Sequence, residues 1–245
     1  MAGVKVFKGI GIVSAQRLGI ENAPMRDLGD VEQFKIAHRT SSITWKQHRR
    51  VGGGNLAKLD TPEGVDLTVQ MQEWSEENQA MVLQGKVVEL EPETVTGEAV
   101  VLIPGSLVVT DFPGPKSLVI TKTQDSTPVP NTEVEVSAAG FRVKEDSTAI
   151  TEPTPATIAY TSTKATRIEP IVEAGAEYKL VLDGLNEADS GRPVVVTIWR
   201  WKAPPAEELA LIDAENPGKL LSKGEVLADT SRPVGESPFY RIDWL

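Results

Sequence analysis

The chain has 245 residues, a formal net charge of −10 and no cysteine. The missing thiols exclude disulfides, zinc–thiolate centres and cysteine nucleophiles. The acidic balance argues against a protein that grips nucleic acid, because such proteins neutralise phosphates with Lys and Arg. The first residues lack the apolar core of a signal peptide, and no run has the length of a membrane span. We therefore expect folding in the cytoplasm and no membrane partner.

A basic, glycine-rich stretch, KQHRRVGGGNLAKLDTPEG (46–64), lies between strands that we expect at about 35–48 and 64–74. Gly52, Gly54 and Ala57 fit the loose spacing of a dinucleotide-binding loop. That motif requires a buried apolar strand before it and a helix after it, and neither neighbour has this character. A connection of roughly fifteen residues is long for a hairpin, and such loops are usually functional or disordered. We therefore predict a mobile hairpin loop with a functional role.

Two clear elements follow this stretch. The apolar residues at positions 65, 67, 69 and 71 alternate with polar ones, which is typical of a half-buried antiparallel strand. The segment EWSEENQAMVLQG (73–85) predicts a helix over about 75–84, with Ser75 as the N-cap, acidic residues in the first turn and Gly85 at the end. The buried face of this helix is expected to consist of Ala80, Met81, Val82 and Leu83.

Strand signals dominate the rest of the chain. Segments in which apolar and polar residues alternate end near 137, 160 and 244. The segment RPVVVTIWRW (192–201) predicts a central strand with Trp199 and Trp201 on one side. Segments 123–131 and 145–155 are expected to be surface loops, and 205–213 is compatible with a second, short helical turn. The fold class is therefore mainly β: a β-sandwich or barrel of antiparallel strands with one flanking α-helix and a long hairpin loop, in a single domain over 1–245.

No pattern predicts a catalytic, metal or cofactor site. His38 and His48 would lie about 33 Å apart along one extended strand, too far to share a metal ion. The sequence has neither a Gly-x-Ser-x-Gly elbow nor a His-Glu-x-x-His motif. Five tryptophans are compatible with a carbohydrate platform, but core packing explains them better. We expect no enzyme and no cofactor.

The segment 26–85 begins with Leu28-Gly29-Asp30 and ends in a helix motif formed by Ser75, Glu77, Asn78, Ala80, Leu83 and Gly85. Followed by segments 184–213 and 224–245 in this order, it resembles the major tail tube proteins of bacteriophages with long non-contractile tails. The family commonly has Leu-Gly-Asn where this chain has Leu28-Gly29-Asp30. The later segments resemble the family's later strands, and the match is weak over about 86–130.

The resemblance implies a structural virion protein and no enzyme. Family members form hexameric rings that stack head-to-tail into the tail tube, which conducts DNA into the host without binding it specifically. Their partners are copies of themselves and the tape-measure, tail-tip and tail-terminator proteins. The implied location is the virion, after a stage in the host cytoplasm.

Within this interpretation, residues 46–64 are the assembly hairpin, a basic segment that docks on the acidic body of the next subunit. A long loop that orders on assembly would keep free subunits from polymerising early. Two alternatives stay open: a tube protein of a contractile or secretion-type injection machine, and a β-sandwich module that binds carbohydrate or protein. The expected contact residues are Lys46, Arg49, Arg50, Gly52, Gly53, Gly54, Asn55, Leu56 and Leu59 in the hairpin, with Glu76 and Gln79 on the helix.

Overall fold

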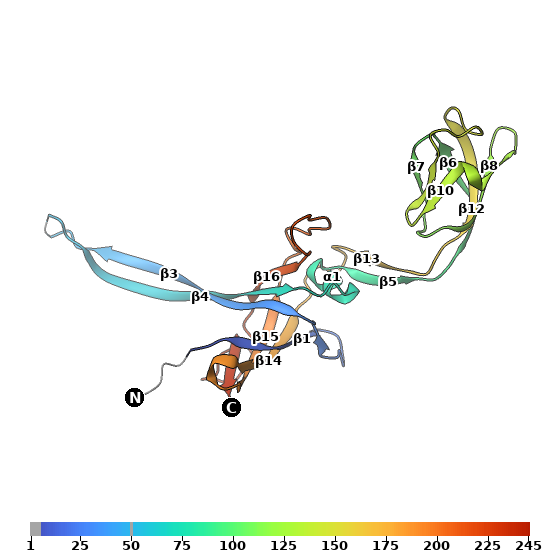
Figure 1. Ribbon diagram of the computed structural model, residues 1–245. Helices are drawn as coiled ribbons and strands as arrows, with labels where there is room; N and C mark the ends of the chain where they lie inside the picture. The colour runs from blue at the N-terminus through green and yellow to red at the C-terminus, as the bar shows by residue number, and fades with distance from the viewer. Residues whose placement is uncertain (1–5, 50) are drawn as a thin grey trace. The chain divides into compact units, whose positions relative to one another are not determined.

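The computed structural model describes residues 6–49 and 51–245 (Figure 1). Strands hold 51% of these described residues and helices 5%, so the protein is mainly β, with antiparallel sheets and, in this part of the chain, one flanking α-helix, as the sequence predicts. The chain divides into two compact units, residues 1–87 with 168–245 and residues 88–167, where the sequence predicted one domain. Each unit has its own cluster of buried apolar side chains, and this division of the core corrects the single-domain prediction.

Unit 1 contains a branched antiparallel sheet in the order β2-β1-β14-β15-β16-β4-β3, with β17 paired to β15. A short 3-10 turn, Glu187–Asp189, follows β14. The strands are β1 (Gly9–Arg17), β2 (Arg26–Asp27), β3 (Val31–Lys46), β4 (Asn55–Met71), β14 (Tyr178–Asn186), β15 (Arg192–Lys202), β16 (Leu220–Val226) and β17 (Tyr240–Trp244).

Unit 2 contains a sheet in the order β6-β12-β8-β9 and another in the order β10-β11-β7. The two strands β5 (Lys86–Leu90) and β13 (Ala165–Glu169) pair with each other, and the unit boundaries fall within them. The strands of unit 2 are β6 (Thr94–Leu102), β7 (Leu107–Val109), β8 (Lys116–Lys122), β9 (Pro128–Val129), β10 (Val134–Ser137), β11 (Gly140–Val143) and β12 (Thr154–Thr161), with a 3-10 turn at Asn131–Glu133.

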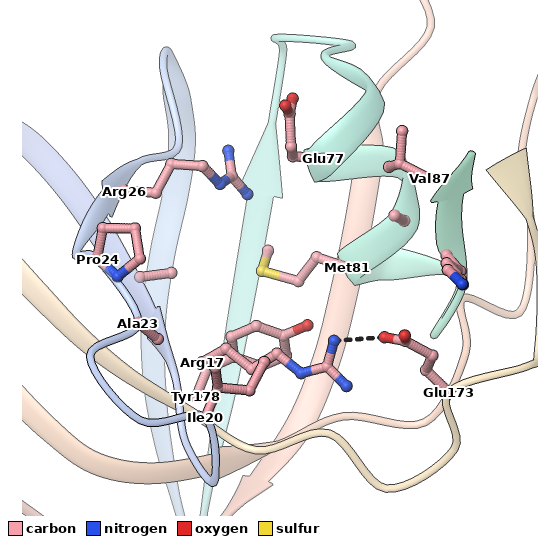
Figure 2. A pocket seen from close by; sticks show the side chains of 14 residues that line it. Arg17, Ile20, Ala23, Pro24, Arg26, Glu77, Met81, Val87, Glu173 and Tyr178 are labelled. Carbon is pink, nitrogen blue, oxygen red and sulfur yellow. Dashed lines mark hydrogen bonds and ion pairs between the residues drawn. The ribbon is translucent and has the colours of Figure 1, made fainter. Parts of the chain in front are cut away.

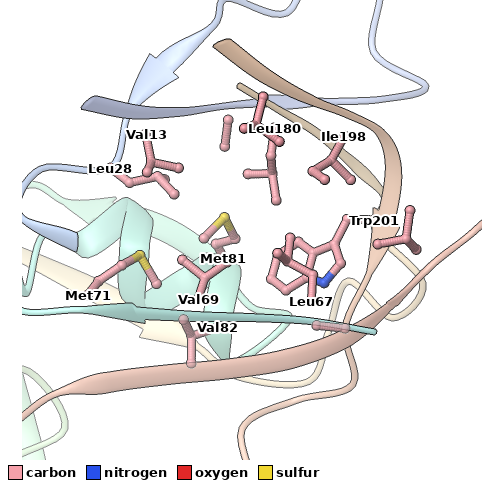
Figure 3. Close-up of a cluster of buried hydrophobic side chains, with 14 of the residues drawn as sticks. Val13, Leu28, Leu67, Val69, Met71, Met81, Val82, Leu180, Ile198 and Trp201 are labelled. Atoms are coloured by element: carbon pink, nitrogen blue, oxygen red, sulfur yellow. The ribbon is translucent and has the colours of Figure 1, made fainter. Parts of the chain in front are cut away.

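The core of unit 1 confirms the alternating strand around 65–71. Val65, Leu67, Val69 and Met71 are at most 5% exposed. Their side chains on β4 meet apolar side chains from β1, β14 and β15, as Figure 3 shows. The pairing partner of β4 on one side is β16, which covers only Val65–Met71. One sheet therefore supplies both walls of this core.

The helix is also confirmed. α1 spans Glu76–Val82, and the Ser75 hydroxyl accepts a hydrogen bond from the backbone N–H of Asn78 at 3.3 Å. Met81 and Val82 are 7% and 1% exposed, whereas Leu83 is only half-buried, so the predicted buried face is wrong at Leu83. The backbone enters the left-handed region one residue before Gly85, at Gln84 with φ 48°.

Several other local predictions need correction. The segment 205–213 forms no helix. A β-bulge opposite Lys179 puts Trp201 in the core at 1% exposure but leaves Trp199 half-buried, so the two rings do not share a side. The predicted loop 123–131 includes the short strand β9, and the loop 145–155 carries the fully buried Ile150 and leads into β12.

Candidate functional site

The most conspicuous surface feature is the distal part of the β3–β4 hairpin, residues 40–63, which we call the arm. Pairing with β16 ends at Val65, so among the described residues of the arm the two strands pair only with each other. The ribbon extends away from the rest of unit 1 in Figure 1. With seven paired residues of β3 at about 3.3 Å each, this ribbon is roughly 20–25 Å long.

The expected fifteen-residue mobile loop is wrong, because most of it is strand. β4 begins at Asn55, so the connection is only 47–54, closed by a hydrogen bond from the Gln47 N–H to the Gly54 carbonyl at 3.0 Å. Gly52 has φ +79°, a backbone conformation in which glycine is favoured. Strand β4 follows the glycines, which confirms that this stretch lacks the helix that a dinucleotide-binding loop needs.

The hairpin residues predicted from the sequence lie in three places. Lys46 is the last residue of β3 and is exposed. The connection contains the exposed residues Arg49, Gly52, Gly53 and Gly54, and β4 begins with the exposed Asn55 and Leu56 and also contains the exposed Leu59. Arg50 lies outside the described residues.

The arm has one apolar and one polar face. Cross-strand pairs Ile43–Leu59 and Trp45–Ala57 lie on one face, and Ile43, Trp45 and Leu59 are 55%, 48% and 50% exposed. The pairs Ser42–Asp60 and Thr44–Lys58 lie on the other face. There the Lys58 ammonium lies 2.8 Å from the Asp60 carboxylate and, with Ser42, lowers the pKa of that carboxyl.

Sequence reasoning missed Ile43, Trp45 and Ala57. Their signal was the alternation of SITWK before the basic residues and of LAKLD after the glycines. The glycines and proline outweighed that alternation in the prediction of a loop.

The base of the arm is fixed to the body of unit 1 by polar contacts. The Arg39 guanidinium lies 3.1 Å from the Asp66 carboxylate and also binds Glu225 of β16. The His38 ring nitrogen and the Tyr240 hydroxyl are 2.9 Å apart, joining β3 to β17. These contacts link the base of the arm to β16 and β17, whereas the described residues of β3 and β4 beyond it pair only with each other.

A second feature of unit 1 is a cavity of about 410 Å³ beside α1, which we call the helix pocket (Figure 2). Apolar side chains from β1, the segment after it, α1, β5 and β14 form most of its wall: Ala15, Ile20, Ala23, Pro24, Ala80, Met81, Val87 and Tyr178. Its charged side chains are Arg17, Arg26, Glu77, Lys86 and Glu173.

Polar contacts hold two of those cations in place. Arg17 forms an ion pair with Glu173, and the Arg26 guanidinium donates to the side-chain oxygen of Asn78 at 2.7 Å. Burial raises the pKa of Tyr178, so this ring remains a neutral phenol at physiological pH. The pocket therefore presents an apolar floor with an ordered polar rim.

The helix residues predicted as contacts differ from each other. Glu76 is exposed at the first position of α1. Gln79 is half-buried, and its side-chain amide donates to the Trp74 carbonyl at 3.1 Å, so it fixes the turn before the helix. Within one subunit, the arm does not lie near α1. The helix follows the end of the β3–β4 ribbon at which Val31 pairs with Met71, whereas the connection 47–54 is at the other end.

Within residues 6–49 and 51–245, no group of three or more His, Asp or Glu side chains is arranged to hold a metal ion. No helix in the same ranges is both long and apolar enough to span a membrane.

Comparison with known proteins adds a family. The family model described as "Protein of unknown function UCP028589" matches residues 6–243. The chain belongs to this family. No curated protein matches the chain. The match includes residues of both compact units.

Proposed function

We propose that this protein is the major tube subunit of a phage tail, of the long non-contractile type. It catalyses no reaction and polymerises, through contacts between copies, into stacked hexameric rings. The resulting tube conducts DNA into the host. Tape-measure, tail-tip and tail-terminator proteins are its other partners, and the virion is its final location.

The observation that carries this proposal is the arm. A two-stranded ribbon is marginally stable in water by itself, and an apolar face on both of its strands makes exposure more costly. A partner that covers Ile43, Trp45 and Leu59 removes that cost. An extension that leaves one end of a subunit and needs a partner suits a head-to-tail stack.

Unpaired strand edges support lateral contacts as well. In the described part of the chain, β3 pairs only with β4, and the Gly9–Ile12 part of β1 pairs only with β14. Ile10 and Ile12 on this edge are 49% and 56% exposed. A groove of about 400 Å³ is lined by residues of β1 and β3. Free edges are templates for pairing with another chain, and such pairing would join neighbouring subunits into a ring.

Electron microscopy of the purified protein over a range of concentrations tests the proposal. Rings or tubes are expected. Single particles at every concentration, together with binding to sugars or to an unrelated protein, would replace the proposal with the binding-module alternative. A sheath protein encoded beside this one and bound to its tubes would assign it to a contractile or secretion-type machine.

A further inference from the structure

The apolar face of the arm does not continue the face of the ribbon that packs in the core of unit 1. Along β3, Phe34 and Ile36 pack against the core of unit 1, and Ile43 and Trp45 are an odd number of residues further on. Side chains on a strand alternate between faces, so the second pair lies on the opposite face. On β4 the bulge at the arm's base reverses the alternation, because Arg39 pairs with Gly64 but Thr40 with Pro62. The apolar face is therefore no extension of the subunit's own core.

The helix pocket lies at the other end of the same ribbon. Pro24 and Arg26 in its wall precede β3, and Met81 belongs to α1, which follows β4. β3 has 16 residues, so its two ends are about 50 Å apart at 3.3 Å per residue. One subunit therefore carries an apolar projection at one end and an apolar pocket at the other, the arrangement that heterologous, open-ended stacking requires.

Charge identifies the occupant of the pocket as a second copy of this chain. The arm contains four basic and two acidic residues, a net charge of +2, whereas the rest of unit 1 has 15 basic and 22 acidic residues, a net charge of −7. Glu21, Asp27 and Glu76 adjoin pocket residues in the sequence and are exposed. Together with the charged residues of the pocket wall they give five carboxylates against three cations. A positive arm is thus steered toward a negative surface around the pocket.

We propose that the arm of one copy docks in the helix pocket of the next, with Trp45 as the main anchor and Ile43 and Leu59 beside it. This inference rests on the proposed tube function and names the contact between successive rings. Aromatic anchors that fill pockets dominate the binding energy of many interfaces. Docking therefore depends on the apolar face of the arm, and the basic residues near its tip steer the approach.

The absence of cysteine allows a direct test by cross-linking. Ala57 lies on the apolar face of the arm, paired with Trp45, and Ala23 lies in the pocket wall. The double variant Ala57→Cys with Ala23→Cys, treated with a short bis-maleimide, is expected to give a ladder of dimers and higher oligomers. The matched control is Thr44→Cys with Ala23→Cys, because Thr44 is on the polar face of the arm. In the control the ladder is expected to be at least tenfold weaker. The separation of about 50 Å along the ribbon prevents a cross-link within one copy.

The same samples are imaged by electron microscopy, so the two proposals fail separately. If tubes form but the Ala57→Cys pair cross-links no more than the Thr44→Cys pair, the docking contact is overturned and the tube function stands. A selective ladder of short oligomers without rings or tubes would support the contact and overturn the tube function. Neither ladder nor tubes would overturn both.

A non-covalent variant provides a second measurement. Trp45 is exposed on the arm, so Trp45→Ser is expected to fold normally by circular dichroism. It is expected to raise the concentration at which tubes form by about tenfold or more, the effect of losing one anchor residue. Thr44→Ser on the polar face is the control. Equal tube formation by Trp45→Ser and the parent would contradict the role of Trp45.

Discussion

Asn78 on α1 offers the sharpest test of how unit 1 is held together, because it is fully buried and has three hydrogen bonds. Its side-chain nitrogen donates to the Leu28 carbonyl at 2.9 Å and to the Glu73 carbonyl at 3.1 Å, and its oxygen accepts from Arg26 at 2.7 Å. These contacts join the helix to the segment that precedes β3. Asn78→Ala removes all three and leaves the two carbonyls without this partner.

The expected loss of stability follows from those contacts. Each neutral hydrogen bond contributes about 1 kcal/mol net, and one to a charged group about 1.5–3 kcal/mol. Asn78→Ala should therefore lower the free energy of unfolding by about 4 kcal/mol. That is a large share of the 5–15 kcal/mol typical of a domain. Asn78→Asp, of nearly the same shape, is expected to lose at least as much, because it places an acceptor against both carbonyls and only the contact with Arg26 survives.

Urea unfolding followed by tryptophan fluorescence measures this loss in the correct unit. All five tryptophans, at positions 45, 74, 199, 201 and 244, belong to unit 1. Gln79→Ala is the matched control on the same helix, since it removes a single hydrogen bond to Trp74 and should cost about 1 kcal/mol. A loss for Asn78→Ala no greater than that of the control would refute the assignment of these hydrogen bonds.

Four further predictions concern other parts of the chain. Phe141→Ala, in the core of unit 2, should lower the free energy of unfolding of that unit by about 3–5 kcal/mol. The unfolding transition followed by circular dichroism should shift, whereas the transition followed by tryptophan fluorescence should not. A shift in both would show that the units unfold together. Met81→Asp should prevent folding of unit 1, whereas Leu83→Asp should yield folded protein, as measured by circular dichroism; the reverse order would contradict the buried face of α1. Replacing Arg49 and Arg50 by Glu should slow tube growth and weaken its dependence on salt without altering the fold, and unchanged kinetics would exclude steering by charge. Trypsin should cleave after Arg49 in the free subunit and more slowly in tubes; cleavage at Lys58 at the same rate as at Arg49 would contradict the strand assigned there.

The sequence predicted the strands of the cores well, since alternation directly reflects burial on one face of a strand. Ala156, Ile158 and Tyr160 are 1%, 1% and 2% exposed, as their alternation indicates. That pattern does not say which core a strand faces. The same alternation puts Leu67 in unit 1 and Ile158 in unit 2, so the division into two units could not be inferred from it.

A bulge explains why the prediction for the two tryptophans of β15 was wrong. A bulge adds one residue to one strand and moves the following side chains to the other face. In β15 this separates Trp199 from Trp201: Trp201 enters the core, and Trp199 lies under the Arg232 guanidinium, 4.1 Å from the ring centre. Simple alternation places the two tryptophans together because a bulge leaves no regular signal in the sequence.

The bulge at the base of the arm has a structural consequence that follows from the same rule. Without it, Leu59 on β4 would lie on the same face as Val65 and Leu67, and the arm's apolar residues on its two strands would not face the same way. With it, Leu59 pairs with Ile43 and Ala57 with Trp45, so both strands contribute to one apolar face. Along the strands, that face is opposite to the one that packs in the unit's own core. A subunit stabilised only by its own packing gains nothing from this arrangement, because the exposed face adds no burial to the monomer. A subunit that packs against another copy gains a two-stranded apolar surface at a distance from its body, which is why we place the intersubunit contact on this face rather than on the glycine-rich tip.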